Sequence, residues 1–186
     1  MSRSTGAVRE DAAVHISAKA EYAVRATVHL ASVSSGPTTT ESIAVAQGIP
    51  GKFLESIMTS LSAAGVVRSQ RGPSGGFWLS RPADAITVAD VLRAVDGPLA
   101  SVRGQAPEDL SYEGSAVPLQ SVWLAVRSAL REVLEHVTLA ELATDDLPEA
   151  VRRRAAEPHV WRTADRALPP DLPSGGRPPT CGPRPA

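Results

Sequence analysis

Charged and hydroxyl side chains between Pro50 and Arg71 have the types and spacing that suit contacts with DNA. Lysine binds guanine or phosphate, glutamate accepts a hydrogen bond from cytosine N4, and serine or threonine can contact several bases. Arginine beside a tight turn suits the narrow minor groove, where the negative potential is enhanced. The predicted DNA-contacting residues are Lys52, Glu55, Ser56, Thr59, Ser60, Arg68, Gln70 and Arg71.

Three helices must position these side chains. Apolar residues recurring at three- and four-residue steps predict helices over residues 17–33, 40–48 and 50–65, with glycine at the ends of the last two. Two short helices joined by a glycine-containing turn are typical of a helix-turn-helix, although the same geometry also occurs in purely structural helical hairpins. The predicted apolar face of the third helix comprises Phe53, Leu54, Ile57, Met58 and Leu61.

A β-hairpin is predicted directly after the third helix. Residues 66–69 and 77–80 have strand character and flank the glycine-rich turn 71–76. A β-hairpin that directly follows a helix-turn-helix is called a wing. The turn lacks the Lys-Ser/Thr ending of a P-loop and the spacing of a dinucleotide-binding loop, so a hairpin is favoured over a phosphate cradle. Residues 56–83 carry three arginines and no acidic residue, which favours an anionic ligand.

A long helix in the second half of the chain has the apolar spacing of a helix that packs against another helix. Its seam is the predicted dimerisation surface and comprises Leu119, Trp123, Val126, Leu130, Val133 and Val137. A capping box at Thr87 precedes a predicted helix over residues 88–95, and a second capping box at Thr138 begins a short helix.

These patterns predict a mainly α-helical fold with a small β-hairpin wing, that is, a winged helix-turn-helix followed by a long dimerisation helix. The predicted regions, in chain order, are a flexible N-terminus (1–14), the winged helix-turn-helix DNA-binding domain (15–82), a connecting helix (83–100), a loop (101–118), the dimerisation helix with a short following helix (119–142), and an Arg/Pro/Gly-rich tail (143–186), largely disordered after about residue 166.

Composition excludes several other classes of protein. The 186 residues are 42% hydrophobic and 21% charged, as in ordinary globular proteins. The formal charge of −1 excludes a bulk polycation, but it averages an acidic stretch over residues 100–150 and a basic tail. The absence of a membrane-length apolar stretch and of a signal peptide predicts a soluble cytoplasmic protein without membrane contacts.

Several segments of the chain resemble the Rrf-two family of dimeric bacterial winged-helix transcription regulators. They include the run from Ser17 to Ala26, the run Gly48-Ile-Pro-Gly-Lys-Phe-Leu-Glu, and the wing Arg71-Gly-Pro-Ser-Gly-Gly-Phe-Trp-Leu. The likeness continues through residues 86–99 to Trp123 and residues 138–142, and it covers roughly residues 15–142. The resemblance implies that Glu55 reads a base from the recognition helix and that Arg71 enters the minor groove. It also implies that the helix from Leu119 mediates dimerisation.

One departure from the family concerns the loop 101–118. Members that sense iron, nitric oxide or redox state carry three cysteines there, and this loop has none. Iron–sulfur ligation needs thiolates, so we predict no cluster, no other cofactor and no metal site. The signal would then be a small molecule, a partner protein or the level of expression.

The sequence therefore predicts a homodimeric regulator, specifically a repressor, that binds an inverted repeat in double-stranded DNA through residues 50–64 and 66–80. The alternative is a protein-interaction module that uses the winged-helix surface and the acidic helix. No catalytic set is evident, so we do not expect an enzyme. The remaining reactive or basic residues are predicted to be an inert tail thiol, surface or capping histidines and a solvated linker: Cys181, His15, His29, His136, His159 and Arg152–Arg154.

Overall fold

The computed structural model describes residues 16–33, 36–72 and 75–161. The predicted N-terminal segment 1–14, His15 and the tail beyond residue 161, including Cys181, lie outside the described residues. The elements are α1 (Ala18–Ser32), α2 (Thr40–Gln47), α3 (Gly51–Ala63), β1 (Val67–Gln70), β2 (Gly76–Leu79), η1 (Ala83–Ala85), α4 (Val88–Asp96), η2 (Pro107–Asp109), η3 (Gly114–Ala116), α5 (Leu119–Leu134), α6 (Leu139–Thr144), α7 (Glu149–Ala155) and η4 (Pro158–Trp161). The predicted mainly helical fold with one β-hairpin is confirmed.

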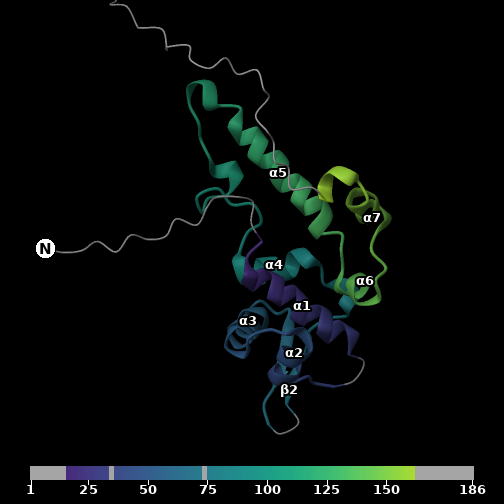
Figure 1. Cartoon of the computed structure of the whole chain (residues 1–186). Helices are drawn as coiled ribbons and strands as arrows, with labels where there is room; N and C mark the ends of the chain where they lie inside the picture. The colour runs from purple at the N-terminus through teal and green to yellow at the C-terminus, as the bar shows by residue number, and fades with distance from the viewer. Residues whose placement is uncertain (1–15, 34–35, 73–74, 162–186) are drawn as a thin grey trace, which may run out of the picture.

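Helix α1 is the centre of a body that also contains α2, α3, α4, α6 and the hairpin (Figure 1). The described core is built almost entirely from aliphatic side chains, because the chain has few aromatic residues. The loop after α4 runs outward from this body, and α5 runs back toward it along the loop (Figure 1). Fully buried side chains of the body include Ile43, Leu54, Ile57, Leu61, Ile86 and Leu139.

Local side-chain caps stabilise several of the helix starts. The Ser17 hydroxyl accepts a hydrogen bond from the Ala20 amide at 2.9 Å and so caps α1. Both predicted capping boxes are present, at Thr87 for α4 and at Thr138 for α6. Each satisfies two backbone donors that the helix itself leaves free.

The two capped helix starts also bind each other. Thr87 and Thr138 form an isolated antiparallel bridge, in which the Val88 amide donates to the Val137 carbonyl and the Leu139 amide donates to the Ile86 carbonyl, both at 2.9 Å. The bridge places α6 against α1, although α6 follows the long helix in sequence. The short helix after α5 therefore packs on the winged body.

The wing is a two-stranded antiparallel hairpin in which Arg68 lies opposite Trp78. Backbone hydrogen bonds of 2.9 and 2.8 Å join Thr38, just before α2, to Phe77 on the outer edge of β2. A Cβ on Gly76 would lie 2.6 Å from the carbonyl oxygen of Thr38, so glycine is required where these backbones meet. The wing is thereby attached to the helix-turn-helix.

Two short helices, α7 and η4, form in the first part of the predicted Arg/Pro/Gly-rich tail, so Arg152–Arg154 lie in a helix and not in the predicted solvated linker. Arg154 pairs with Glu132 of α5 at 2.9 Å, and Arg152 pairs with Asp146 at 3.5 Å. The basic residues in the last turn of α7 also interact favourably with the helix dipole and so stabilise the helix. Arg152 and Arg154 thus support a helix. Among the described residues, no helix has the length and apolar character to cross a membrane.

Candidate nucleic-acid interface

Helix α3 presents the row of polar side chains that the sequence predicts. Gly48 ends α2 in the left-handed conformation, with φ of 61°, and turns the chain into α3. One face of α3 is buried in the core through Leu54, Ile57, Met58 and Leu61. On the other face Lys52, Glu55, Ser56 and Thr59 are exposed and Ser60 is half-buried.

Two hydroxyls of this row are bound to the helix backbone. Thr59 Oγ1 donates to the Glu55 carbonyl at 2.9 Å, and Ser60 Oγ donates to the Ser56 carbonyl at 3.2 Å. Lys19 of α1 donates from Nζ to Ser60 Oγ at 3.3 Å and to a carbonyl at the end of α4. The hydroxyl protons of Thr59 and Ser60 are used in these hydrogen bonds, so the two hydroxyls can accept further hydrogen bonds but not donate them. The side chains of Lys52, Glu55 and Ser56 form no hydrogen bond or ion pair with the described part of the chain.

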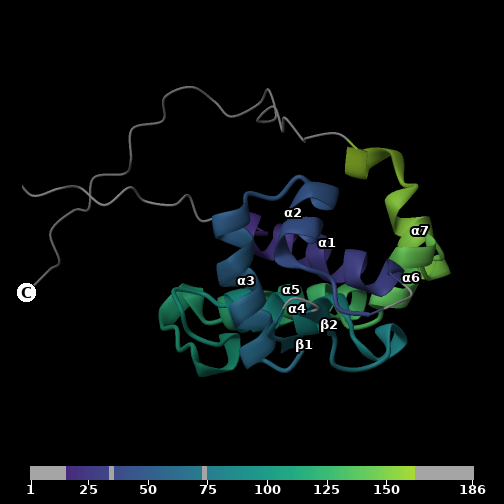
Figure 2. The same cartoon turned by 90° about the horizontal axis from the view of Figure 1, so that it is seen from below.

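The wing presents the second group of predicted residues. Arg68 and Gln70 of β1, and Arg71 directly after it, are all exposed. A Cβ on Gly75 would lie 2.3 Å from the Gln70 carbonyl oxygen, so the hairpin returns to β2 only with glycine there. Figure 2 shows the body from below; β1 follows α3 directly in the chain and packs against it.

The basic residues of α3 and the wing have no acidic partners within the three described ranges: Lys52, Arg68 and Arg71 form no ion pair there. Arg103 and Arg153 are the other described arginines in that state. Phosphate groups could therefore bind Lys52, Arg68 and Arg71 without displacing a carboxylate. The paired arginines elsewhere are Arg25, Arg81, Arg93, Arg127, Arg131, Arg152 and Arg154.

The prediction that Phe53 belongs to the apolar core face of α3 is wrong, because its side chain is 53% exposed. Its ring meets the Tyr22 ring edge to face, with centroids 6.3 Å apart and an interplanar angle of 77°. The guanidinium of Arg25, which is also a residue of α1, lies over the Tyr22 ring, 5.8 Å from the ring centroid. Phe53 therefore lies on the surface beside Lys52, held by α1.

The predicted dimerisation seam lies on one side of α5. Leu119, Trp123, Val126, Leu130 and Val133 are all half-buried, and no residue of α5 is fully buried. Val137 lies beyond the end of α5 and is buried within this chain at the bridge to α4. The structure thus separates Val137 from the other five seam residues.

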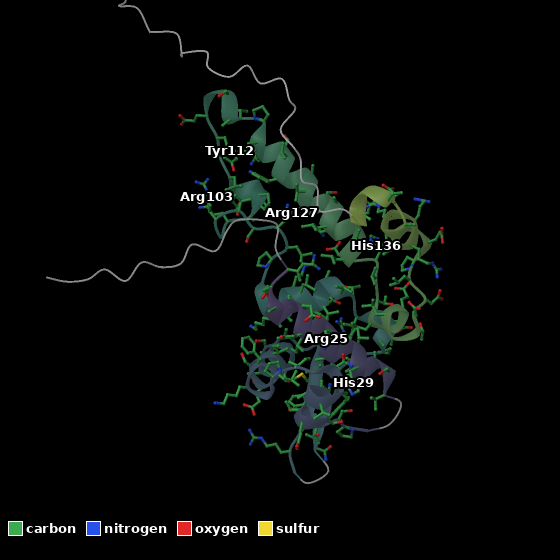
Figure 3. The ribbon with its side chains drawn as sticks, viewed as in Figure 1. Arg25, His29, Arg103, Tyr112, Arg127 and His136 are labelled. Atoms are coloured by element: carbon green, nitrogen blue, oxygen red, sulfur yellow. The ribbon has the colours of Figure 1, made fainter. Side chains whose placement is uncertain are left out.

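Three side chains of α5 hold the loop 101–118 in place, a role that the sequence predicted for none of them. Gln120 Nε2 donates to the carbonyls of Pro107, Glu108 and Leu110, the last at 2.7 Å. Trp123 Nε1 donates to the Tyr112 hydroxyl at 3.0 Å. Arg127 forms an ion pair with Glu108; Figure 3 shows Tyr112 and Arg127 in this upper part of the molecule. A hydrogen bond from its own backbone, followed by the one from Arg127, lowers the pKa of Glu108.

Another side of α5 remains uncovered. Val122, Ala125 and Ala129 are exposed, with Val122 at 49%. Their spacing of three and four residues places them on one helix face, next to the half-buried seam. An apolar face of this kind on a helix with no buried residue is typical of an interface.

A second network connects the base of α5 to the winged body. Arg93 of α4 pairs with Glu135, which also binds Arg131 at 2.9 Å. The hydrogen bond from Arg93, and next the one from Arg131, lower the pKa of Glu135. The carboxylate therefore stays ionised over a wider acid range than an isolated glutamate.

A helix-turn-helix with an attached wing and an exposed polar recognition face defines a winged-helix DNA-binding protein. The family model Rrf2, described as iron-dependent transcriptional regulator, matches residues 16–145. The chain belongs to the Rrf2 family, which is the Rrf-two family of the sequence resemblance. It is a DNA-binding transcriptional regulator and not an enzyme.

Two bacterial transcriptional regulators are similar to this chain over most of its length. The HTH-type regulator Rv1287 of Mycobacterium tuberculosis is 51% identical over 143 residues, which are 76% of this chain and 89% of that protein. The regulator CymR of Bacillus subtilis is 37% identical over 138 residues, 73% of this chain and 95% of CymR.

Two solved structures share the fold. The structure of CymR, described as the global cysteine regulator of B. subtilis, matches with a TM-score of 0.60 and 32% identity over 70% of this chain and 97% of CymR. The T. potens IscR structure matches with a TM-score of 0.57 and 32% identity over 80% of this chain and 96% of that chain.

The loop of this chain does not fit an iron–sulfur cluster. Residues 101–118 contain neither cysteine nor histidine, and the Glu108 carboxylate in that loop is paired with Arg127. Among the described residues, no three His, Cys, Asp or Glu side chains are grouped to hold a metal ion. Thiolates are the usual ligands of such clusters, so the donors present are of the wrong kind.

Proposed function

We propose that two copies of this chain form a dimer that binds an inverted-repeat operator and represses adjacent genes in the cytoplasm. In this complex α3 lies in the major groove, with Lys52, Glu55 and Ser56 at the base edges and Thr59 and Ser60 further along the helix. Arg68 and Gln70 face the DNA from the wing, and Arg71 enters the minor groove.

The observation that carries this proposal is that the basic residues of α3 and the wing are exposed and form no ion pair with any residue that the structure describes. Lys52 lies on α3, Arg68 lies on β1 and Arg71 follows directly after it, and β1 packs against α3. Free cations on a rigidly attached pair of elements can bind phosphates with little loss of ion pairing or conformational entropy.

Dimerisation through α5 is supported by the state of that helix in one chain. Isolated helices of about this length are marginal in water, so a helix without buried residues needs a covering surface. A second α5 would cover Val122, Ala125 and Ala129 together with the seam. A two-fold axis then relates the two α3 helices, which predicts half-sites about one helical turn, or a multiple of it, apart.

The absence of an iron–sulfur cluster is part of the proposal. Gln120, Trp123 and Arg127 already hold the loop in place of metal ligands. The signal is then a small molecule, a partner protein or the level of expression. Protein purified without oxygen should contain iron and acid-labile sulfide far below one equivalent per chain, and stoichiometric amounts of both would refute this part.

In vitro selection from a random duplex pool tests the DNA-binding proposal. The full chain should enrich an inverted repeat, and light scattering should give the mass of two chains per operator. A reporter whose promoter overlaps the enriched site should fall in expression when the protein is present. Failure to enrich any sequence, with no retention of genomic DNA, would favour the protein-interaction alternative.

A further inference from the structure

Phe53 is an exposed aromatic side chain on the first turn of the recognition helix. Its neighbours Lys52, Glu55 and Ser56 are the exposed polar residues of the same two turns. Within α3, all of whose residues are described, Phe53 is the single large apolar side chain on the exposed side, with 53% exposure. The N-terminal turns of a recognition helix are the part that reaches base edges, so an exposed ring on the first turn of α3 is in a position to contact a base.

The ring is held in a defined orientation by α1. Tyr22 contacts it edge to face, at 6.3 Å between centroids, and Arg25 lies over the Tyr22 ring at 5.8 Å. Arg25 is in turn paired with Glu21 at 3.4 Å. This stack limits the rotation of Phe53, so that the part of the ring not covered by Tyr22 is presented at a fixed position.

We propose that Phe53 contacts the 5-methyl group of one thymine per half-site and so sets the preference for thymine at that position. The inference rests on the proposed function and deepens it. In the major groove the thymine methyl is the apolar feature that distinguishes this base, and phenylalanine is one of the side chains that read it. Glu55 and Ser56 supply hydrogen bonds beside it, and Phe53 supplies the apolar contact.

Replacement of thymine by deoxyuridine tests the contact, since it removes the methyl group and leaves the hydrogen-bonding edge unchanged. Each thymine of the selected operator is replaced symmetrically in both half-sites, and affinity is measured by fluorescence anisotropy. For the wild-type chain, one position should lose about fourfold per half-site, the factor expected for exposing one methyl group. The Phe53→Ala variant should bind the thymine and deoxyuridine operators equally at that position.

The matched control is Val45→Ala, which removes another exposed apolar side chain, 79% exposed, from the helix-turn-helix. It should keep the wild-type deoxyuridine penalty. A penalty that is the same in the wild type and in Phe53→Ala would overturn the inference. So would specific binding without a deoxyuridine-sensitive position, or a selected half-site without thymine; in both cases the proposed function would stand.

The wild-type scan can refute the inference by itself, so the test does not depend on the folding of Phe53→Ala. If selection yields no operator at all, the proposed function fails, and the assignment of Phe53 fails with it.

Discussion

Replacing Arg71 by alanine removes one cation per protomer from the wing without breaking an ion pair, because Arg71 forms none within the described residues. Together with Lys52 and Arg68, three such cations per protomer make six per dimer. If each cation, whether it lies in a groove or at the backbone, displaces the counterions of one phosphate, the slope of log affinity against log salt is about −5 for the wild type. The Arg71→Ala dimer loses two contacts, which brings the slope to about −3.5.

The same change should weaken operator binding. An arginine contact with DNA contributes about 1–3 kcal/mol, so the loss from both half-sites is at least about 2 kcal/mol, or about thirtyfold in Kd. Fluorescence anisotropy over a series of salt concentrations gives both quantities from one titration set.

Arg153→Ala is the matched control. Arg153 is also exposed and unpaired among the described residues, but it lies on α7, which packs beside α5 away from the wing (Figure 1). This variant changes the net charge equally and should keep the wild-type slope and Kd. An Arg71→Ala protein with the wild-type slope, or an equal loss in Arg153→Ala, would refute the assignment of the wing to DNA.

The remaining predictions concern specificity, assembly and stability. Glu55→Ala should relax the base preference at one position per half-site, which repeated selection from the random pool would detect as a lost consensus base. Ala129→Glu should give monomers by light scattering, whereas Ser128→Glu, on a neighbouring face of α5, should remain dimeric. Gln120→Leu should lower the unfolding free energy by about 1–3 kcal/mol in urea titrations, because three loop carbonyls lose their donor. Since the pKa of Glu135 is lowered in the folded chain, its contribution to stability is present above the ordinary glutamate pKa and is lost as pH falls through the lowered value. The stability difference between the wild type and Glu135→Gln should therefore shrink on acidification.

Local features were predictable because they depend on residues within a few positions. The caps at Ser17, Thr87 and Thr138 are set by side chains that bind amides three residues later. The glycine turn at Gly48 and the hairpin around Gly76 follow in the same way, from a backbone conformation that other residues rarely adopt and from a close approach that leaves no room for a Cβ. These features define most of the winged helix-turn-helix.

Contacts between distant segments were not predictable. Phe53 lies at the edge of the apolar face by helical spacing, and the tertiary contact with Tyr22, 31 positions earlier by residue number, leaves it on the surface. Gln120 is a polar residue off the seam and would ordinarily be solvated. Its partners are carbonyls of a loop 10 to 13 residues earlier, whose path no periodicity reveals.

Sequence-specific DNA binding is tested most directly by the ratio of two affinities. One is the affinity of the full chain for its selected operator, and the other is its affinity for a scrambled duplex of the same base composition at physiological salt. The operator should be bound at least about 1,000-fold more tightly. Equal affinity for the two duplexes would contradict the account.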